Sequence, residues 1–282
     1  MIAVEKLITD DGAELVPSIN RQRIAAATKD LVDGFGKRWI WSQIAWQEIR
    51  QKYRGSVLGP FWLTVTTLVM VSAMGVLYSH LLNANIDVYI PYLTTGLVLW
   101  QFIAATINDG CETFISMRGV ILQLPMPFSI YAYRAVYRNL IALAHNLILV
   151  PFVLLLFHVP VNWHIVLFLP GLLLVCLNGV WISLLLGLIS ARFMDIKPIV
   201  SSFLQIVFFV TPVFWPADAL GRWKILAELN PLFAAVDITR SPLLGTPIAP
   251  YSWWVAIATL LIGSAVSFAF FARFRSRIAY WL

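Results

Sequence analysis

The sequence carries little charge for its length, and almost none of that charge lies in its longest apolar stretches. Charged residues make up 12% and hydrophobic residues 60% of the 282 residues, and the mean hydropathy is +0.81. Six stretches of about 17 to 26 residues have the length that a helix needs to cross a bilayer core of about 30 Å. They are residues 61–82, 91–107, 136–157, 165–190, 199–215 and 252–272. Arg138 is the one charged residue in them, so the sequence predicts an all-α integral membrane protein with six transmembrane helices.

Several kinds of site are also missing from the sequence. The two cysteines, Cys111 and Cys176, are too few for a disulfide framework. Residues 34–37 (Gly-Phe-Gly-Lys) lack the spacing and the Ser or Thr of a Walker A loop, and the four histidines lack metal-ligand spacing. The apolar stretches hold no paired acidic residues of the kind that ion-coupled carriers use. We therefore expect no catalytic residue, no metal and no cofactor bound by this chain.

The distribution of positive charge indicates an orientation. Seventeen of the 20 Lys and Arg residues flank the stretches on one side, and Arg222, Lys224 and Arg240 lie on the other. This bias predicts that both termini are cytoplasmic. The net charge of +6 is then a topology signal and not a sign of nucleic-acid binding. We expect residues 1–34 to be a loosely structured cytoplasmic lead without a cleavable signal peptide, and residues 273–282 to be a basic cytoplasmic tail.

The segment of residues 35–58 has a helical period but is too polar to span a bilayer. One face of this predicted helix carries Phe35, Trp39, Ser42, Trp46, Ile49 and Tyr53. Such a face suits the headgroup layer, so we predict an amphipathic interfacial helix ahead of a transmembrane domain at residues 59–272. The helix either only anchors the chain or also contacts a cytoplasmic partner.

Two connections also carry structural signals. In the cytoplasmic connection, Asp109 and Glu112 have capping-box spacing and Pro125 follows an amphipathic run, which predicts a helix over residues 109–124. That helix is either a lever arm or a plain connector. The external segment of residues 216–251 is rich in proline and apolar residues, and we interpret it as re-entrant or interfacial helices.

Aromatic residues are abundant, with 12 Trp, 9 Tyr and 18 Phe. Most are expected to form interfacial belts or helix packing. A minority could line a conduit for sugars, because aromatic faces stack on sugar rings without holding them tightly. The candidates are Tyr78, Trp100, Phe102, Trp181, Phe208, Phe209 and Trp215.

Five segments, in order along the chain, resemble the membrane subunits of type 2 ABC exporters, and in particular the permeases for O-antigen and related polysaccharides. They are WQEIRQKYRGSVLGPFW (46–62), ARFMDI (191–196), TPVFWP (211–216), NPL (230–232) followed by Arg240, and RFRSRIAYWL (273–282). The second departs from the family pattern, because Met194 stands where Arg or Lys is common.

The resemblance implies a homodimer that pairs with two copies of a separate ABC ATPase, which would hold the ATP and magnesium. Its substrate would be an undecaprenyl-diphosphate-linked polysaccharide, and its place the bacterial inner membrane. The ATPase-coupling candidates are then Trp46, Glu48, Arg50, Lys52, Arg54, Glu112 and Arg118. The channel and gate candidates are Tyr78, Phe102, Trp181, Phe208, Phe209, Trp215, Asn230, Pro231 and Arg240.

Four arginines are candidates for holding the lipid diphosphate, because guanidinium pairs well with phosphate. They are Arg50, Arg54, Arg134 and Arg138. The alternative is that they contact ordinary anionic membrane lipids. Two other functions stay open: a type 2 exporter of teichoic acid, capsule, another lipid or a drug, and a membrane enzyme acting on polyprenyl-linked sugars.

Overall fold

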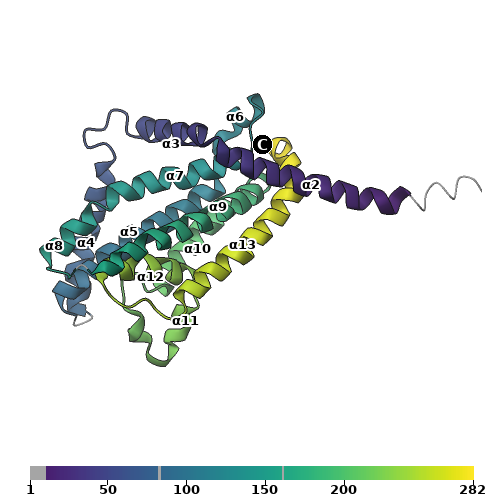
Figure 1. Ribbon diagram of the computed structural model, residues 1–282. Helices are drawn as coiled ribbons and strands as arrows, with labels where there is room; N and C mark the ends of the chain where they lie inside the picture. Colours follow the sequence, from purple (N-terminus) through teal and green to yellow (C-terminus); the bar gives the residue numbers. More distant parts are fainter. Residues whose placement is uncertain (1–10, 82–83, 161) are drawn as a thin grey trace, which may run out of the picture.

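The protein is a bundle of long apolar helices, seen in a computed structural model that describes residues 11–81, 84–160 and 162–282 (Figure 1). Over these residues the regular structure is entirely helical. Within the described ranges, five helical segments are long and apolar enough to cross a membrane: Phe61–Leu81, Ile86–Cys111, Ser129–Leu156, Trp163–Arg192 and Ser252–Trp281. The predicted all-α membrane fold is confirmed to this extent.

The sixth apolar helix is shorter than expected. It is α10 (Ile196–Val210), and its 15 residues extend about 22 Å, less than a hydrocarbon core of about 30 Å. The chain leaves the helix at Thr211, although the apolar stretch continues to Trp215. A sixth span therefore stays a prediction.

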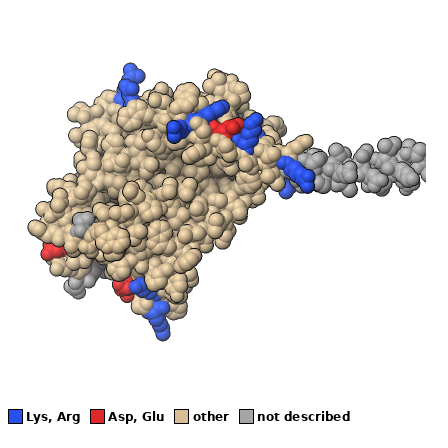
Figure 2. Space-filling view, in the orientation of Figure 1, with Lys and Arg blue, Asp and Glu red and all other residues tan. Residues whose placement is uncertain are grey.

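Two helices form the centre of the bundle. They are α5 (Ile86–Cys111) and α9 (Phe168–Arg192), which pack against each other. Around them lie α4 (Phe61–Leu81), α7 (Ser129–Asn146), α8 (Leu149–Leu156), η2 (Trp163–Leu167) and α13 (Ser252–Phe274). The predicted third span is thus two helices, because the chain breaks at Leu147 and Ile148. Figure 2 shows Lys and Arg gathered toward opposite ends of the molecule, with a wide uncharged belt between them.

The end of the bundle at which residues 11–52 and the C-terminus lie is called the α3 end. It holds α2 (Asp11–Gly36), α3 (Arg38–Lys52), η1 (Ile115–Met117), α6 (Arg118–Gln123), η4 (Arg275–Arg277) and α14 (Ile278–Trp281). The expectation of a loosely structured lead is wrong for residues 11–34, which belong to α2, while residues 1–10 lie outside the described chain. Tertiary contacts explain the difference, because α2 packs on α7 and α13 (Figure 1).

The predicted helix over residues 109–124 is also corrected. Helix α5 continues to Cys111, and Glu112 occupies its C-cap position, so the capping-box interpretation of Asp109 and Glu112 is wrong. The new helical turn begins at Ile115. Helix α5 extends beyond the apolar stretch because its last residues, Gly110 and Cys111, are buried inside the protein.

Helix α3 lies on α7. Ala45 and Ile49 are its buried residues, whereas Trp39 and Trp46 are 68% and 48% exposed. Of the predicted interfacial face, Ile49 is thus buried in the protein, and the contact of its exposed tryptophans with headgroups stays a prediction. The inner face packs on the bundle, and the outer face is left free by the described residues.

The opposite end of the bundle is called the α11 end. It holds η3 (Ala217–Trp223), α11 (Lys224–Glu228) and α12 (Pro231–Leu244). Helix α12 returns into the bundle, where it contacts α5, α9 and α13 and has 10 of its 14 residues buried. It ends at Gly245, whose φ of +66° is the left-handed conformation that favours glycine. Segment 216–251 is helical as expected, and its re-entrant position in a membrane stays a prediction.

Candidate functional site

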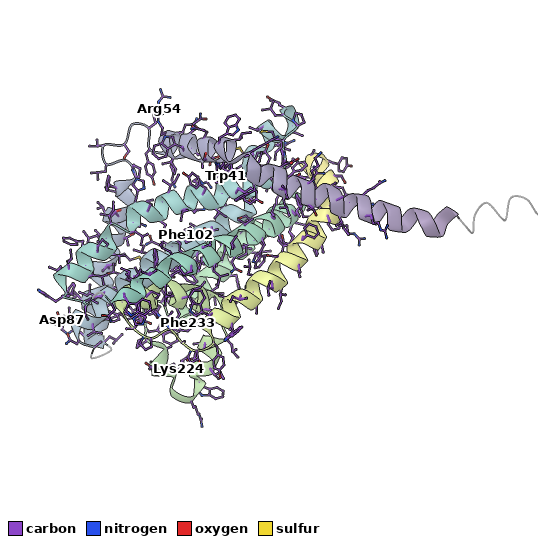
Figure 3. The ribbon with its side chains drawn as sticks, viewed as in Figure 1. Trp41, Arg54, Asp87, Phe102, Lys224 and Phe233 are labelled. Carbon is purple, nitrogen blue, oxygen red and sulfur yellow. The ribbon has the colours of Figure 1, made fainter. Side chains whose placement is uncertain are left out.

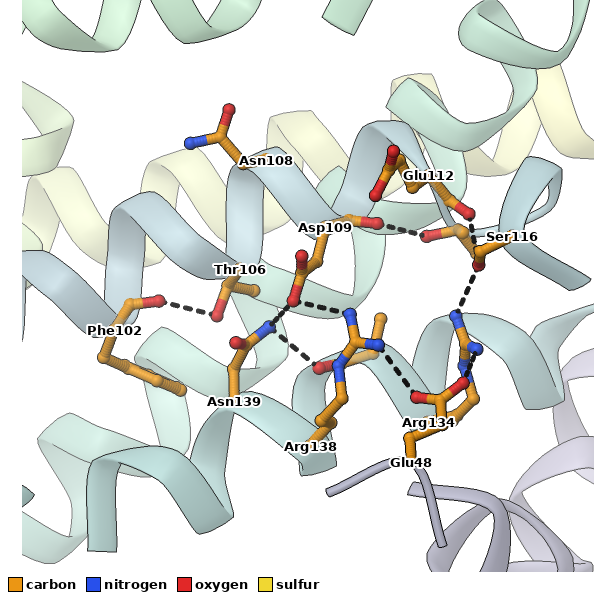
Figure 4. A network of polar contacts seen from close by, with 12 residues as sticks. Glu48, Phe102, Thr106, Asn108, Asp109, Glu112, Ser116, Arg134, Arg138 and Asn139 are labelled. Atoms are coloured by element: carbon orange, nitrogen blue, oxygen red, sulfur yellow. Dashed lines mark hydrogen bonds and ion pairs between the residues drawn. The ribbon is translucent and has the colours of Figure 1, made fainter. Parts of the chain in front are cut away.

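A cluster of four charged side chains ties α3 to the bundle (Figure 4). Glu48 of α3 forms an ion pair with Arg134 and a second one, at 2.8 Å, with Arg138. Both arginines project from α7, one turn apart, so they reach the same carboxylate. Arg138 also contacts Asp109 of α5 at 2.7 Å. These contacts join α3, α5 and α7 at one point.

Neutral side chains complete this cluster. The side-chain amide of Asn139 donates to Asp109 at 2.8 Å, and Arg134 donates to the hydroxyl of Ser116 at 3.2 Å. The cluster of two carboxylates and two guanidiniums has no net charge, and Arg134 has 0% of its surface exposed. A buried ion pair costs desolvation that close geometry and added hydrogen bonds must offset, and this arrangement supplies both.

This pairing changes the interpretation of the four candidate arginines. Arg134 and Arg138 are held by carboxylates inside the protein, so we no longer place them among the candidate diphosphate ligands. Arg50 and Arg54 are exposed. Figure 3 places Arg54 on the loop between α3 and α4, pointing away from the bundle. Two of the four candidates therefore remain available to a ligand.

The outer face of the α3 end forms a groove of about 540 Å³ between α3 and the η1–α6 region. Its walls carry Trp39, Gln43, Gln47 and Gln51 from α3 and Val120 and Leu124 from the other side. Arg118 is exposed at the start of α6, and Glu112 pairs with Lys197 of α10 at 2.5 Å. Of the coupling candidates, Trp46 and Arg118 are exposed at this end but outside the groove lining. Glu48 borders the groove while its carboxylate pairs with Arg134 and Arg138.

A second cavity lies beneath the end of α3 and has a volume of about 260 Å³. It is lined by Glu48, Lys52, Tyr53, Asp109 and Arg138 among others. Burial raises the pKa of the Tyr53 phenol, which stays protonated as a donor at neutral pH. Lys52 thus lines the pocket beside the charged cluster and does not line the outer groove.

Asp30 was not expected from the sequence, and it fixes α2 in place. Its carboxylate accepts hydrogen bonds from the backbone N–H groups of Phe128 and Ser129, at 3.1 and 2.9 Å, where α7 begins. Arg275 also donates to it, at 2.6 Å. Asp30 therefore caps α7 from a distant helix and joins the lead to the C-terminal region. No local spacing signals this contact, because its partners lie 98 and 245 residues away.

Arg240 organises the α11 end. It lies in α12, is 4% exposed, and donates to the carbonyls of Pro212 and Val213 at 3.0 and 3.4 Å. Its guanidinium carbon lies 4.0 Å from the centre of the Tyr92 ring. Asn230 donates to the hydroxyl of Thr211 at 3.0 Å. Two gate candidates, Arg240 and Asn230, thus hold the turn that follows α10.

Two tyrosines that the sequence analysis missed hold the same turn from α5. The hydroxyl of Tyr89 donates to the carbonyl of Phe214 at 2.7 Å, and that of Tyr92 to the carbonyl of Trp215 at 2.9 Å. Residues 211–215 form no regular helix, so their backbone groups depend on such side chains. Pro212 and Pro216, which break a helix inside an apolar stretch, are the sequence signal that would have pointed to a need for such donors.

The aromatic candidates separate into two groups. Tyr78, Phe208 and Phe209 gather around Phe214, with ring centres 5.3, 5.3 and 6.0 Å from it. The indole N–H of Trp215 donates to the carbonyl of Phe209. Trp100 joins this group through Phe208, at 5.5 Å between ring centres. The other two candidates, Phe102 and Trp181, line an apolar cavity of about 170 Å³ together with Pro231. The structure thus brings the candidates together at two places and not along one surface of the subunit.

The part of the chain that matches a known family runs from α3 to the end of α12. The ABC-2 type transporter family matches residues 41–244. An O-antigen export system permease protein RfbA of Myxococcus xanthus is 24% identical over 199 residues, covering 69% of this chain and 76% of that protein. Two proteins of the same name from Klebsiella pneumoniae are 20% identical over 195 residues, covering 67% and 74%, and 21% identical over 239 residues, covering 83% and 91%.

Proposed function

Because this chain belongs to the ABC-2 type transporter family, we propose that it is the membrane subunit of an exporter for polyprenyl-diphosphate-linked O-antigen or a related polysaccharide. The chain is a multi-pass membrane protein of a family whose subunits assemble with an ATPase. The names of its relatives support the cargo class. The proposed location is the bacterial inner membrane, with the α3 end and both termini in the cytoplasm.

The coupling of ATP hydrolysis to transport is proposed to start in the groove between α3 and α6. A cytoplasmic ATPase, which would carry the ATP and magnesium, would seat against Trp46 and Arg118 on the exposed face. The observation that carries this proposal is the ion pairing of Glu48 with Arg134 and Arg138. Because these side chains fix α3 to α7, a displacement of α3 by the ATPase would also displace a membrane helix.

The channel is proposed to form between two copies of this chain, with α4 and α10 facing the partner copy. Leu204 is the one buried residue of α10. Of the residues in the most apolar stretch of α4, 17% are buried, against 67% in that of α5. The aromatic group around Phe214 lies beside α10 and would offer ring faces to passing sugars. Arg50 and Arg54 remain as the proposed contacts to the lipid diphosphate.

The decisive experiment is affinity purification of the full chain from its native cells in mild detergent, with analysis of surface glycan from the same cells. We expect an ATPase with a Walker A loop to co-purify in equal amount. Trp46→Glu should remove the ATPase, because it places a charge on the exposed face of α3 where the ATPase would seat. Lipid-linked glycan should then accumulate inside the cell. Trp223→Glu is the matched control, since Trp223 is 56% exposed at the α11 end.

Two results would contradict the proposal at different levels. A dimer that purifies without any ATPase would remove ATP-driven export. Normal co-purification, with normal surface glycan in cells that lack this chain, would keep the exporter and point to another cargo, such as a different lipid or a drug.

A further inference from the structure

A long apolar groove runs along α9 on its side between α7 and α13, and it has a volume of about 670 Å³. Its floor is formed by Leu173, Cys176, Leu177, Val180, Trp181 and Leu184 of α9. Nearly all of the lining is hydrocarbon or aromatic. Ser267, one of the few polar residues there, already donates its hydroxyl to the carbonyl of Trp181 at 3.0 Å. The groove therefore suits a hydrocarbon chain.

The packing of the bundle keeps this groove open. Helices α7 and α13 both pack on α9 and lie on either side of it (Figure 1). Helix α2 contacts α7 and α13 across the α3 end and closes the groove there with Leu31 and Phe35. The contacts of Asp30 with Ser129 and Arg275 fix α2 in that position. The groove thus has a floor, two walls and one closed end.

The length of the groove matches one leaflet of a bilayer. From Leu173 to Leu184 the floor extends about 16 Å at 1.5 Å per residue. Half of a hydrocarbon core of about 30 Å is about 15 Å. The groove therefore has room along its floor for one acyl chain of a phospholipid in the leaflet at the α3 end, reaching from the headgroup layer to the middle of the bilayer.

The closed end has the chemistry of a headgroup layer. The rings of Phe35 and Tyr133 meet edge to face at 5.9 Å, and those of Trp41 and Tyr137 at 5.2 Å. Such rings favour the boundary between hydrocarbon and headgroups. Arg38 is exposed at the junction of α2 and α3, directly beside Lys37, and supplies positive charge near this boundary. This combination of aromatic rings and positive charge suits an anionic phosphate of a lipid headgroup.

We propose that this groove is a lipid site that holds one acyl chain of an anionic phospholipid, with its phosphate beside the junction of α2 and α3. The lipid fills the space between α7 and α13 and completes the contact of α2 with the bundle. This site is distinct from the proposed channel, which lies on the α4 and α10 side of the subunit. It gives the α2 segment a role that does not depend on the exported cargo.

The test uses the full chain in nanodiscs that contain phosphatidylglycerol with a photoreactive diazirine on one acyl chain. After illumination, we expect cross-linked peptides to come mainly from the floor and walls of the groove. Val180→Trp fills the floor and should lower this cross-linking about tenfold, the effect of losing about two buried methylene groups. Ile262→Trp is the matched control, since Ile262 is 66% exposed on α13 and does not line the groove.

Cys176→Phe provides a second filling variant if Val180→Trp does not yield a monodisperse protein. Equal cross-linking of the groove and of the exposed face of α13 that carries Trp254 and Ile262 would overturn the proposal, because it would show ordinary lipid contact. Displacement of the label by polyprenyl phosphate but not by unlabelled phosphatidylglycerol would also overturn it, since the occupant would then be the carrier lipid.

Discussion

Arg134, fully buried in α7, is ion-paired with Glu48 of α3, 86 residues earlier in the chain. This one contact places a charged side chain of the surface helix α3 against a membrane helix. Arg138 forms ion pairs with the same carboxylate of Glu48 and with Asp109 of α5. The α3 end is therefore held by a neutral set of charges that works as a unit.

Replacing Glu48 should destabilise the protein strongly. Glu48→Gln leaves Arg134 buried without a carboxylate, and breaking a buried ion pair from one side costs about 3–5 kcal/mol. The double variant Glu48→Gln/Arg134→Gln should recover part of that loss, because no charge is then left unpaired. Thermal unfolding of the purified protein in detergent measures both. Arg50→Gln, at an exposed position on the same helix, should change stability by less than about 0.5 kcal/mol. Equal unfolding temperatures for Glu48→Gln and Arg50→Gln would contradict the assignment.

Replacing Asp30 should release α2 from the bundle. Asp30→Ala removes the cap on α7 and the partner of Arg275, and the loss of such a cap costs about 1–2 kcal/mol. Limited proteolysis should then cut α2 faster than in the parent protein. Asp33→Ala is the control, since Asp33 is exposed on the same helix. Unchanged cutting of the Asp30 variant would show that other contacts suffice to hold α2.

Replacing Arg240 should loosen the turn after α10. Arg240→Met leaves the carbonyl of Val213 without this donor, at a cost of about 1–3 kcal/mol for an unsatisfied group. The carbonyl of Pro212 also loses Arg240 but keeps the hydroxyl of Tyr92 as a donor at 3.2 Å. Hydrogen exchange of the backbone amides in residues 211–215 should become faster. Arg240→Lys should not rescue it fully, because an ammonium lacks the planar fork and stacks less well on Tyr92. Arg222→Met, at an exposed position, should leave the exchange rates unchanged.

A substitution at Gly96 tests the packing between α5 and the turn of residues 211–215. A Cβ atom at Gly96 would lie 2.4 Å from the carbonyl oxygen of Val213, so Gly96→Ala must displace backbone. We expect a lower unfolding temperature and loss of transport. Gly119→Ala in α6 is the matched control, because its Cβ would meet nothing within 4 Å. It should be neutral or stabilise by about 0.5–1 kcal/mol, the usual difference between alanine and glycine in a helix. If both variants behave alike, the turn does not pack on α5 as described.

The two exposed arginines test the proposed contact with the lipid diphosphate. Arg50→Ala combined with Arg54→Ala should lower surface glycan severalfold while the amount of protein in the membrane stays normal, because neither side chain is buried. Arg273→Ala combined with Arg277→Ala, two exposed positions at the α3 end outside the proposed coupling surface, is the control for lost positive charge. A glycan level in the Arg50 and Arg54 variant that equals that of this control would remove Arg50 and Arg54 from the mechanism.

The relation between hydropathy and helix position explains which elements were predictable. The first span was expected at residues 61–82 and is observed as Phe61–Leu81, because a long uncharged run has no other stable form in a bilayer. The start of α5 at Ile86 was missed, since Pro91 lies inside the helix and Asp87 near its beginning. Asn85 caps this helix by accepting from the N–H of Asp87, a signal that hydropathy does not contain.

The sequence by itself determined the membrane fold, the segments that carry the family resemblance and the list of charged residues near the spans. Only the tertiary structure decided what those residues do. Arg134 and Arg138 are neutralised within the subunit, whereas Arg50 and Arg54 are not buried, and nothing local to α7 or α3 distinguishes them. The physical reason is that ion pairs and caps join residues far apart in the chain. Hydropathy records the preference of each segment for lipid or water, and the choice of partner is made only when the helices pack.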